Sequence, residues 1–564
     1  MYCGTVSSLC LLETVVGCFQ ILINTMGLLT DPNSGGVNRP LQMITEHHKL
    51  VSWLLYVAGL VFLLVLAHPV YNERTYFSEN ALLPGLVTGG YDQERSAVHY
   101  LTSLQEENKK YPGHAPLPWL EAQFKQLGLE VYTQHFSLHY PLRNSSFSGT
   151  NLYAILRSAK SSSTESLVLS APHRPPNSPH QSTDAGIALL LSTAKYFRSQ
   201  IYWAKDIIFL ITEHEFLGTQ AWLEAYHGVS CGSQGVLHTG HLAARAGSIQ
   251  AAINLELSSE FPTHINLKIE GLNGQLPNLD LVNLVTRLVS REGLRPMLHS
   301  VEEHPRPDSY KGFIKSLKTL VYMMTSQATG VPSGNHGLYH RFSVEAITLE
   351  GVTTRMKKRH QGDFHVLGRI IEGTFRSLNN LLERFHQSFF FYLLPSTGRY
   401  VSIGLYMPMF SLLAAGLPLT AVALWYSLLT PPQSRPAPPA LPPHLASLLP
   451  LLLASHALGL LATHLPSMAA KTGASLDLLP EEAVPLSLAS FTLLLLLLPL
   501  LPVRLVRIPG DTVQCVAALQ LSAILGAMSL YNISLATFLT VPLVPLAVLA
   551  SHRQCWSLSR VMIT

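Results

Sequence analysis

"FLITEHEFLGTQAWLEAYH", residues Phe209–His227, is the stretch of sequence that decides the fold. It begins inside a continuous apolar run that starts at Asp206. Two glutamates flanking a histidine follow the run directly, and a helix-like segment comes next. A continuous apolar strand that leads into a helix is typical of a parallel sheet buried on both faces. Binding sites in such sheets form at the carboxyl ends of the strands.

Short apolar runs alternate with helical patterns on both sides of this stretch. We expect strands at Ser166–Ala171, Asp206–Thr212, Ile249–Leu257, His264–Gly271 and Glu345–Val352. We expect helices at Thr183–Gln200, Ala221–His227, Leu279–Val289 and Leu367–Gln387. The alternation predicts an α/β domain with a mostly parallel sheet and helices on both faces. The strand, acidic pair and glycine turn within Phe209–His227 resemble those of zinc aminopeptidases, and this resemblance implies an aminopeptidase-like fold.

The composition of the chain indicates a membrane protein. Charged residues make up 13% of the 564 residues, against about 25% in a typical soluble domain. Only ten of them lie between Val401 and Thr564. Apolar stretches long enough to cross the hydrocarbon layer predict an α-helical multi-span domain. The expected spans are Leu50–Ala67, Val401–Leu429, about Leu445–Leu465, Pro485–Val503, Val513–Leu530 and Leu535–Ala550.

Loop charges indicate the orientation of these spans. With a cytosolic amino terminus, the loop arginines after residue 400 face the cytosol. Of the basic residues there, only Lys471 falls on the other side, beside Asp477, Glu481 and Glu482. Tyr71 to about Arg399 then lies in a lumen or outside the cell, where Asn144 in Asn-Ser-Ser is a glycosylation candidate. The net charge of +4 is too small and too scattered to suggest a nucleic-acid partner.

These observations predict five regions. They are a cytosolic region 1–49, a first transmembrane helix 50–70, a lumenal domain 71–388, a membrane bundle of about five helices 389–551, and an atypical tail 552–564. We expect residues 1–25 to be an upstream extension of the gene model. Cys231 is the only cysteine in the large polar segment, so we expect it to be unpaired.

Potential metal ligands stand at the ends of the expected strands. They are His173, Asp184, Glu213, Glu256 and His336. Their order resembles the zinc aminopeptidase arrangement, in which zinc takes nitrogen and oxygen ligands and holds a water. However, aligning Leu217-Gly218-Thr219 on the turn of those enzymes puts Thr212 where they carry the glutamate that activates water. Asp184 also stands one or two residues late. We therefore expect no catalytic residue and no bound zinc, and at most the remnant of a site.

Structural interpretations compete with the metal interpretation at each position. Asp184 suits a helix N-cap. Glu213, His214 and Glu215 suit a solvated loop, and His336 suits an ordinary loop position. Glu256 needs a partner in any interpretation, because it lies in an apolar strand.

Several long segments together resemble the family of glycosylphosphatidylinositol (GPI) anchor attachment proteins. They are Arg74–Gly85 (RTYFSENALLPG), Ser163–Leu169, Phe209–His227, Gly274–Leu284 and Leu381–Pro408. The resemblance implies a non-catalytic subunit of the GPI transamidase of the endoplasmic reticulum membrane. It also implies partners: other transamidase subunits, including a caspase-like cysteine subunit, the GPI lipid and the carboxyl-terminal signal of a proprotein. The alternative is a membrane-anchored zinc-dependent aminopeptidase.

Residues just after the first span are candidates for contact with the GPI head group. Tyr76 suits the membrane interface, Ser78 and Asn80 offer hydrogen bonds, and Glu79 offers a carboxylate for an ammonium group. The alternative is that this segment only packs against the lumenal domain. Phe385–Leu394 is strongly aromatic, and either the membrane interface or core packing explains it.

Overall fold

The structure is a computed structural model that contains a large α/β unit and a helical unit. It describes residues 46–83, 89–140, 145–160, 164–175, 178–232, 236–354, 362–381, 383–385, 390–429, 449–476, 478–497 and 510–550. The α/β unit comprises Phe62–Pro408 together with Met528–Ala536. The helical unit comprises Met1–Val61, Met409–Ala527 and Thr537–Thr564.

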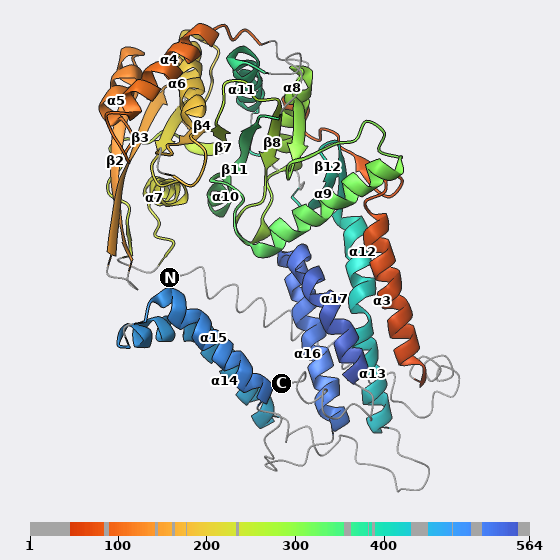
Figure 1. Cartoon of the computed structure of the whole chain (residues 1–564). Coiled ribbons are helices and arrows are strands. Elements are labelled where there is room, and N and C mark those ends of the chain that lie inside the picture. Colours follow the sequence, from red (N-terminus) through yellow and green to blue (C-terminus); the bar gives the residue numbers. More distant parts are fainter. Residues whose placement is uncertain are drawn as a thin grey trace, which may run out of the picture. The chain divides into compact units, whose positions relative to one another are not determined.

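A ten-stranded sheet forms the centre of the α/β unit in the part of the chain that the structure describes (Figure 1). Its order is β10-β9-β8-β11-β7-β4-β5-β3-β2-β6. The strands are β2 Glu130–Tyr140, β3 Ser145–Leu156, β4 Glu165–Pro172, β5 Asp206–Thr212, β6 Leu237–His238, β7 Ser248–Leu257, β8 His264–Lys268, β9 Arg295–Leu298, β10 Val301–Glu302 and β11 Glu345–Val352.

The four central strands β11, β7, β4 and β5 run parallel to one another. β3 is antiparallel to β5, and β8 is antiparallel to β11. The sheet is therefore mixed, and the prediction of a mostly parallel sheet applies to its centre. The sequence analysis missed the outer strands because β2 and β3 form a long hairpin whose outer residues are partly exposed.

Helices cover both faces of the sheet, and the predicted α/β class is confirmed (Figure 1). They are α4 Glu94–Asn108, α5 Leu117–Gln126, α6 Asp184–Ser199, α7 Phe216–His227, α8 Leu279–Arg291, α9 Tyr310–Thr329, α10 His336–Tyr339 and α11 Phe364–Asn379. Single 3₁₀ turns lie at Asn80–Leu82, Leu272–Gly274 and His340–Phe342. The predicted helix Leu367–Gln387 is too long, because α11 ends at Asn379.

β5 shows why this sequence forms a central strand. Successive side chains of a strand point to opposite faces. Phe209 packs against Phe124 of α5 and Phe197 of α6. Ile208 and Leu210 belong to a core cluster on the other face with Trp222 of α7 and Leu338 of α10. Both faces are buried, so the strand needs the continuous apolar run seen in the sequence.

A second, three-stranded sheet has the order β1-β13-β12, with β1 at Glu73–Arg74, β12 at Tyr392–Ser396 and β13 at Arg399–Ser402. The guanidinium of Arg399 donates to the carbonyl oxygen of Pro69 at 2.8 Å and to the side-chain oxygen of Asn72 at 2.9 Å. Residues 390–408, which the sequence analysis placed in the membrane bundle, thus belong to the α/β unit. Leu393 and Leu394 are buried there, which supports core packing for the described end of the aromatic segment.

The helical unit contains most of the apolar helices. Three helices among the described residues are long and apolar enough to cross a membrane: His48–Val65 (α3), Ile403–Ser427 and Asp511–Tyr531. Ile533–Leu549 is a shorter apolar helix. The sequence Ile403–Ser427 comprises α12 Ile403–Ala414 and the start of α13 Gly416–Leu429, and the other elements are α14 Leu449–Ala474, α15 Pro480–Leu497, α16 Gly510–Tyr531 and α17 Ile533–Ala550. α14 and α15 occupy the places of the spans expected at Leu445–Leu465 and Pro485–Val503.

Small and polar residues join α3 to its neighbours in this unit. A side chain at Gly59 would bring its first carbon within 2.8 Å of Leu413, so the glycine allows close packing. The hydroxyl of Tyr56 donates to the carbonyl oxygen of Val541 at 2.7 Å. Small residues of this kind are common where membrane helices meet.

Candidate functional site

The candidate metal ligands come from neighbouring elements at the carboxyl edge of the parallel strands. His173 follows β4, Glu213 follows β5, and Glu256 is the penultimate residue of β7. Asp184 is the first residue of α6 and His336 is the first residue of α10. The parallel register explains why these positions meet at one edge of the sheet.

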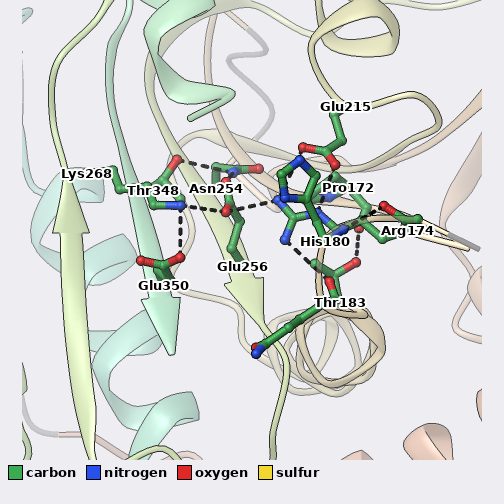
Figure 2. Close-up of polar contacts among 12 residues, drawn as sticks. Pro172, Arg174, His180, Thr183, Glu215, Asn254, Glu256, Lys268, Thr348 and Glu350 are labelled. Carbon is green, nitrogen blue, oxygen red and sulfur yellow. Dashed lines mark hydrogen bonds and ion pairs between the residues drawn. The ribbon is translucent and has the colours of Figure 1, made fainter. Parts of the chain in front are cut away.

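Glu256 lies between two cations. Its carboxylate accepts from the guanidinium of Arg174 at 3.1 Å and from the ammonium of Lys268 at 2.9 Å (Figure 2). Arg174 also donates two hydrogen bonds to the Glu215 carboxylate, at 3.0 and 3.2 Å. Lys268 pairs in addition with Glu350 at 3.0 Å. The result is a charge cluster of three carboxylates and two cations, which we call the Glu256 cluster.

Both cations remain protonated in this setting. Burial alone lowers the pKa of Lys268, but the carboxylates of Glu256 and Glu350 outweigh burial and raise it above its ordinary value. Burial likewise opposes the charge of Arg174, and Glu215 and Glu256 raise its pKa. Positive charge therefore already occupies the surroundings of Glu256, where a zinc ion would need negative or neutral ligands.

His336 is completely buried next to this cluster. Its Nδ1 atom lies 2.8 Å from the hydroxyl of Thr348, and its Nε2 atom has no hydrogen-bond partner among the described residues. Burial is the largest cause that lowers its pKa well below the usual value, and nearby His340 and Lys268 lower it further. The neutral ring that results is also the form that binds metals, but the Lys268 charge opposes any ion placed close to it.

His173 and Asp184 are joined through an asparagine that the sequence analysis did not consider. The Nε2 atom of His173 lies 3.4 Å from the side-chain oxygen of Asn108, and the Asn108 amide donates to Asp184 at 3.0 Å. Burial lowers the pKa of His173. Asp184 is not the helix N-cap, because Thr183 holds that position and Asp184 begins the helix. Asn108, at the end of α4, thus binds both side chains.

Glu213 is buried and bound to backbone groups. Its two carboxylate oxygens accept from the amides of Ala115 at 2.7 Å and Thr150 at 2.8 Å. The solvated-loop interpretation is therefore wrong for Glu213, which is 5% exposed. Its carboxylate ties the turn after β5 to β3 and to the segment before α5.

The turn that follows Glu213 is sharp. His214 and Glu215 both have positive φ, at 56° and 47°, which is unusual for residues other than glycine. A side chain at Gly218 would place its first carbon 2.0 Å from the carbonyl oxygen of Glu213. The turn therefore requires glycine at position 218. The preceding Thr212, at the place of the water-activating glutamate, is buried, and its hydroxyl has no hydrogen-bond partner among the described residues.

The five candidates do not form one ligand set. Within the described ranges, no three His, Cys, Asp or Glu side chains are placed to hold a metal ion. Arg174 and Lys268 supply charge to Glu256, backbone amides bind Glu213, and Asn108 binds His173 and Asp184. These residues do not fit a zinc ion. Arg174 directly follows His173 in the sequence. Its positive charge beside a candidate ligand was a signal against a metal site, and the sequence analysis did not use it.

A cleft of about 470 Å³ opens beside the Glu256 cluster. Its lining residues are Asn266, Leu267, Lys268, Glu270, His299, Ser300, Tyr322, Thr325, Ser326, Ser333 and Glu350. The carboxylate of Glu270 lies 2.7 Å from Nε2 of His299 and accepts from the Ser333 hydroxyl at 3.0 Å. Lys268 and Glu350 pair with each other, and Glu270 contacts His299 and Ser333, so these cleft residues already have partners within the unit.

The candidate GPI-contact residues are held against α8. The backbone amides of Ser78 and Glu79 donate to the two oxygens of Asp280, each at 3.0 Å, and Asn283 donates to the carbonyl oxygen of Tyr76 at 2.9 Å. Burial raises the pKa of Asp280 although these amides act against the increase. These bonds use backbone groups, and the side chains of Tyr76 and Asn80 are exposed. The segment therefore packs against the α/β unit and still presents side chains to its surroundings.

Two other sequence predictions concern modification. Cys231 forms no disulfide among the described residues and is partly exposed. The glycosylation candidate Asn144 lies outside the described residues.

Comparisons with known proteins agree on one family. A family model described as Gaa1-like, GPI transamidase component, matches residues 148–564. The GPI transamidase component gaa1 of Schizosaccharomyces pombe is 33% identical over 396 residues, which are 69% of this chain and 66% of the relative. The GPI transamidase component GAA1 of Saccharomyces cerevisiae is 30% identical over 378 residues, which are 64% of this chain and 54% of the relative. The matched part thus spans about half to two thirds of these relatives.

Solved structures resemble about half of this chain distantly. A leucine aminopeptidase precursor from Bacteroides thetaiotaomicron has a TM-score of 0.30 and 13% identity, over 52% of this chain and 100% of that chain. A likeness this weak carries no argument about the chemistry of the site.

Proposed function

This chain belongs to the Gaa1-like family of GPI transamidase components, and from that premise we propose that it is a non-catalytic subunit of such a transamidase. The complex resides in the membrane of the endoplasmic reticulum. A caspase-like partner subunit supplies the cysteine nucleophile. This chain helps to bring the GPI lipid and the carboxyl-terminal signal of a proprotein to that nucleophile.

The state of Glu256 carries the proposal. A metallopeptidase needs a carboxylate that is free to hold a metal, and a second one that takes a proton from water. Glu256 instead bonds to Arg174 and Lys268, and Thr212 stands at the place of the proton acceptor. A domain in this state organises a reaction whose chemistry another chain performs, and it needs no zinc.

Loop charges support a lumenal orientation of the α/β unit. With the amino terminus in the cytosol, five loop arginines after residue 400 face the cytosol, as the positive-inside rule expects. The lumen is also where the carboxyl-terminal signal of a translocated proprotein is exposed. We therefore assign the α/β unit to the lumenal side, together with the segment from Tyr76 to Asn80.

Contact with the GPI head group is assigned to Tyr76, Ser78, Glu79 and Asn80. The support is that Asp280 and Asn283 hold the backbone of this segment, so their bonds leave its side-chain carboxylate and amide for other contacts. Glu79 pairs with an ammonium group of the lipid. Replacing Glu79 by Gln should lower GPI transfer to a reporter while complex assembly stays normal, and unchanged transfer contradicts this assignment.

The main test distinguishes a non-catalytic subunit from a chain whose own side chains take part in the reaction. Cells that lack this chain are complemented with the full-length protein or with the double variant His173→Gln/His336→Gln, and a GPI-anchored reporter is measured at the cell surface. Because neither histidine holds a metal in our proposal, the variant should support the reporter in proportion to its abundance. Loss of the reporter at normal abundance would show that these side chains take part in the chemistry.

Purification of the full chain from membranes supplies an independent test. Mass spectrometry of the purified material should detect further transamidase subunits, including a caspase-like cysteine protein. Metal analysis of the same sample should find no stoichiometric zinc. Zinc together with chelator-sensitive release of amino acids from peptides would instead identify a peptidase.

A further inference from the structure

α9 differs from the other helices of the α/β unit in what it leaves exposed. Its twenty residues contain three lysines and no acidic residue. One side is buried against the unit through Thr319, Leu320, Met323 and other residues. The outer side carries large apolar residues: Tyr310 is 78% exposed, Ile314 42% and Val321 43%.

These exposed residues form an ordered surface. Tyr310, Ile314 and Val321 recur at intervals of four and seven residues, so they form one stripe along the helix. Lys311, Lys315 and Lys318 each follow a position in or near this stripe and form a second stripe beside it. The ammonium of Lys318 lies 5.3 Å from the ring centre of Tyr322. An apolar stripe flanked by lysines is typical of helices that lie in the surface of a membrane.

The amino-terminal end of α9 lies next to the end of a candidate membrane span. α3, the first of these spans, ends at Val65. The ring of His68, three residues later, packs on Phe313 of α9, with 6.0 Å between ring centres. Both residues belong to the α/β unit.

The carboxyl-terminal end of α9 lies next to a second such point. The junction Met528–Ala536, which contains the end of α16, the turn at Asn532 and the start of α17, belongs to the α/β unit. In this turn the Asn532 amide donates to the carbonyl oxygen of Gln327 at 2.7 Å, and the Ser534 hydroxyl donates to the Gln327 side chain at 2.5 Å. Gln327 lies near the end of α9, and α16 is a candidate span that ends at Tyr531.

We propose that α9 lies flat in the membrane surface, with its apolar stripe among the lipid head groups and its lysines against lipid phosphates. A helix of twenty residues is about 30 Å long. Both of its ends meet chain that has just left a span, and such points lie at the level of the membrane surface. A helix fixed at that level at both ends is parallel to the membrane. This inference rests on α3 and α16 crossing the membrane and is independent of the proposed transamidase function.

Site-specific photo-crosslinking of the full-length chain in its native membrane tests this placement. p-Benzoylphenylalanine replaces Ile314 or Val321, the membranes are irradiated, and mass spectrometry identifies the adducts. We expect phospholipid adducts at both positions. Ile201 is the matched control, because it is apolar and 81% exposed but far from α9 in the sequence, and it should give none.

The positive control is Val57, which is exposed on α3 and should react with lipid. If Val57 gives lipid adducts while Ile314 and Val321 give none, the proposal is wrong. Adducts with another protein at positions 314 and 321 would also overturn it, because the stripe would then be a protein interface.

The lysines are tested in the same assay. Replacing Lys311, Lys315 and Lys318 together by Glu should lower the lipid adduct yield at position 314 several-fold, because each basic side chain attracts the lipid surface. Replacement of all three by Arg should preserve the yield. Replacement by Gln, which adds no repulsion, should give an intermediate yield at normal chain abundance. Equal yields in all variants would overturn the contact between the lysines and phosphates.

Discussion

Glu213 and Glu256 occupy similar positions in the sheet but are stabilised in different ways. Both are carboxylates at the ends of parallel strands, β5 and β7, which are separated by β4, and both are buried, at 5% and 6% exposure. Glu213 receives two backbone amides, whereas Glu256 receives two cations. A buried carboxylate at a ligand position is therefore no sign of a metal. The groups around the carboxylate determine whether it needs a metal. Here amides or cations already stabilise its buried negative charge.

The difference has energetic consequences. Backbone amides are fixed by the fold and carry no net charge, so Glu213 depends mainly on hydrogen bonds, with the exposed His114 ring 3.8 Å from its carboxylate. Glu256 belongs to a network in which the loss of one member leaves an uncompensated charge of a neighbour. We therefore expect substitutions in the Glu256 cluster to have larger effects than substitutions at Glu213.

The largest effect is expected for Arg174→Met. This substitution removes one cation from Glu256 and the only bidentate partner of Glu215 in the described structure. Breaking a buried ion pair in this way costs ~3–5 kcal/mol. The free energy of unfolding of the solubilised full chain measures the loss.

Arg295→Met is the matched control for that prediction. Arg295 pairs with Glu302, but both side chains are well exposed, at 42% and 30%. Exposed pairs contribute ~0–1 kcal/mol. Equal losses for the two variants would show that the Glu256 cluster behaves like a surface pair.

A smaller effect is expected for Glu213→Gln. The amide group keeps one acceptor oxygen, so one of the two backbone amides, of Ala115 or Thr150, loses its partner. A buried donor without a partner costs ~1–3 kcal/mol. Denaturant unfolding should detect this loss. A loss greater than that of Arg174→Met would reverse the ranking of the two regions.

A still smaller effect on stability is expected when the pH is lowered. It tests whether His340, which lies near His336, is neutral in the folded chain. Burial, the largest cause, lowers the pKa of His340 from 6.5 to about 4. A lowered pKa means that the stabilising contribution is present above pH 6.5 and is lost as the pH falls towards 4. The thermal midpoint of the wild type should therefore fall more steeply over this window than that of His340→Gln. If the thermal midpoints of the two proteins fell in parallel with pH, His340 would not be held in its neutral form by the fold.

We expect zinc to have no effect on the stability of the chain. The unfolding midpoint of the full chain should be the same in zinc and in chelator, because two cations already neutralise Glu256. A rise in the midpoint with zinc concentration would mean that Arg174 and Lys268 give way to a metal. That result would show that the Glu256 cluster can still serve as a metal site.

The sequence predicted the centre of the fold better than its edges. β4, β5 and β7 are buried on both faces, and their mostly apolar sequences are visible without a structure. β13 was missed because its partner β1 lies more than 300 residues earlier. The short sequences of β12 and β13 also merge with the apolar residues of α12. Long-range pairing of this kind leaves no local pattern.

The candidate site was also predicted only in part. Polar residues at the ends of parallel strands were found because the fold gathers such ends at one edge. Their partners were missed because they come from elements that no pattern connects to them. Lys268 reaches Glu256 from antiparallel β8, and Asn108 reaches His173 from α4.

The docked turn between α16 and α17 has a consequence for the maturation of the chain. Asn532, Ile533 and Ser534 spell an acceptor sequence for N-linked sugar. In the folded unit the Asn532 amide is occupied by the carbonyl oxygens of Gln327 and Asn273, and the Ser534 hydroxyl is buried. A glycan cannot be attached to an amide held in this way. Sugar at this position would therefore mark molecules in which the turn had not docked.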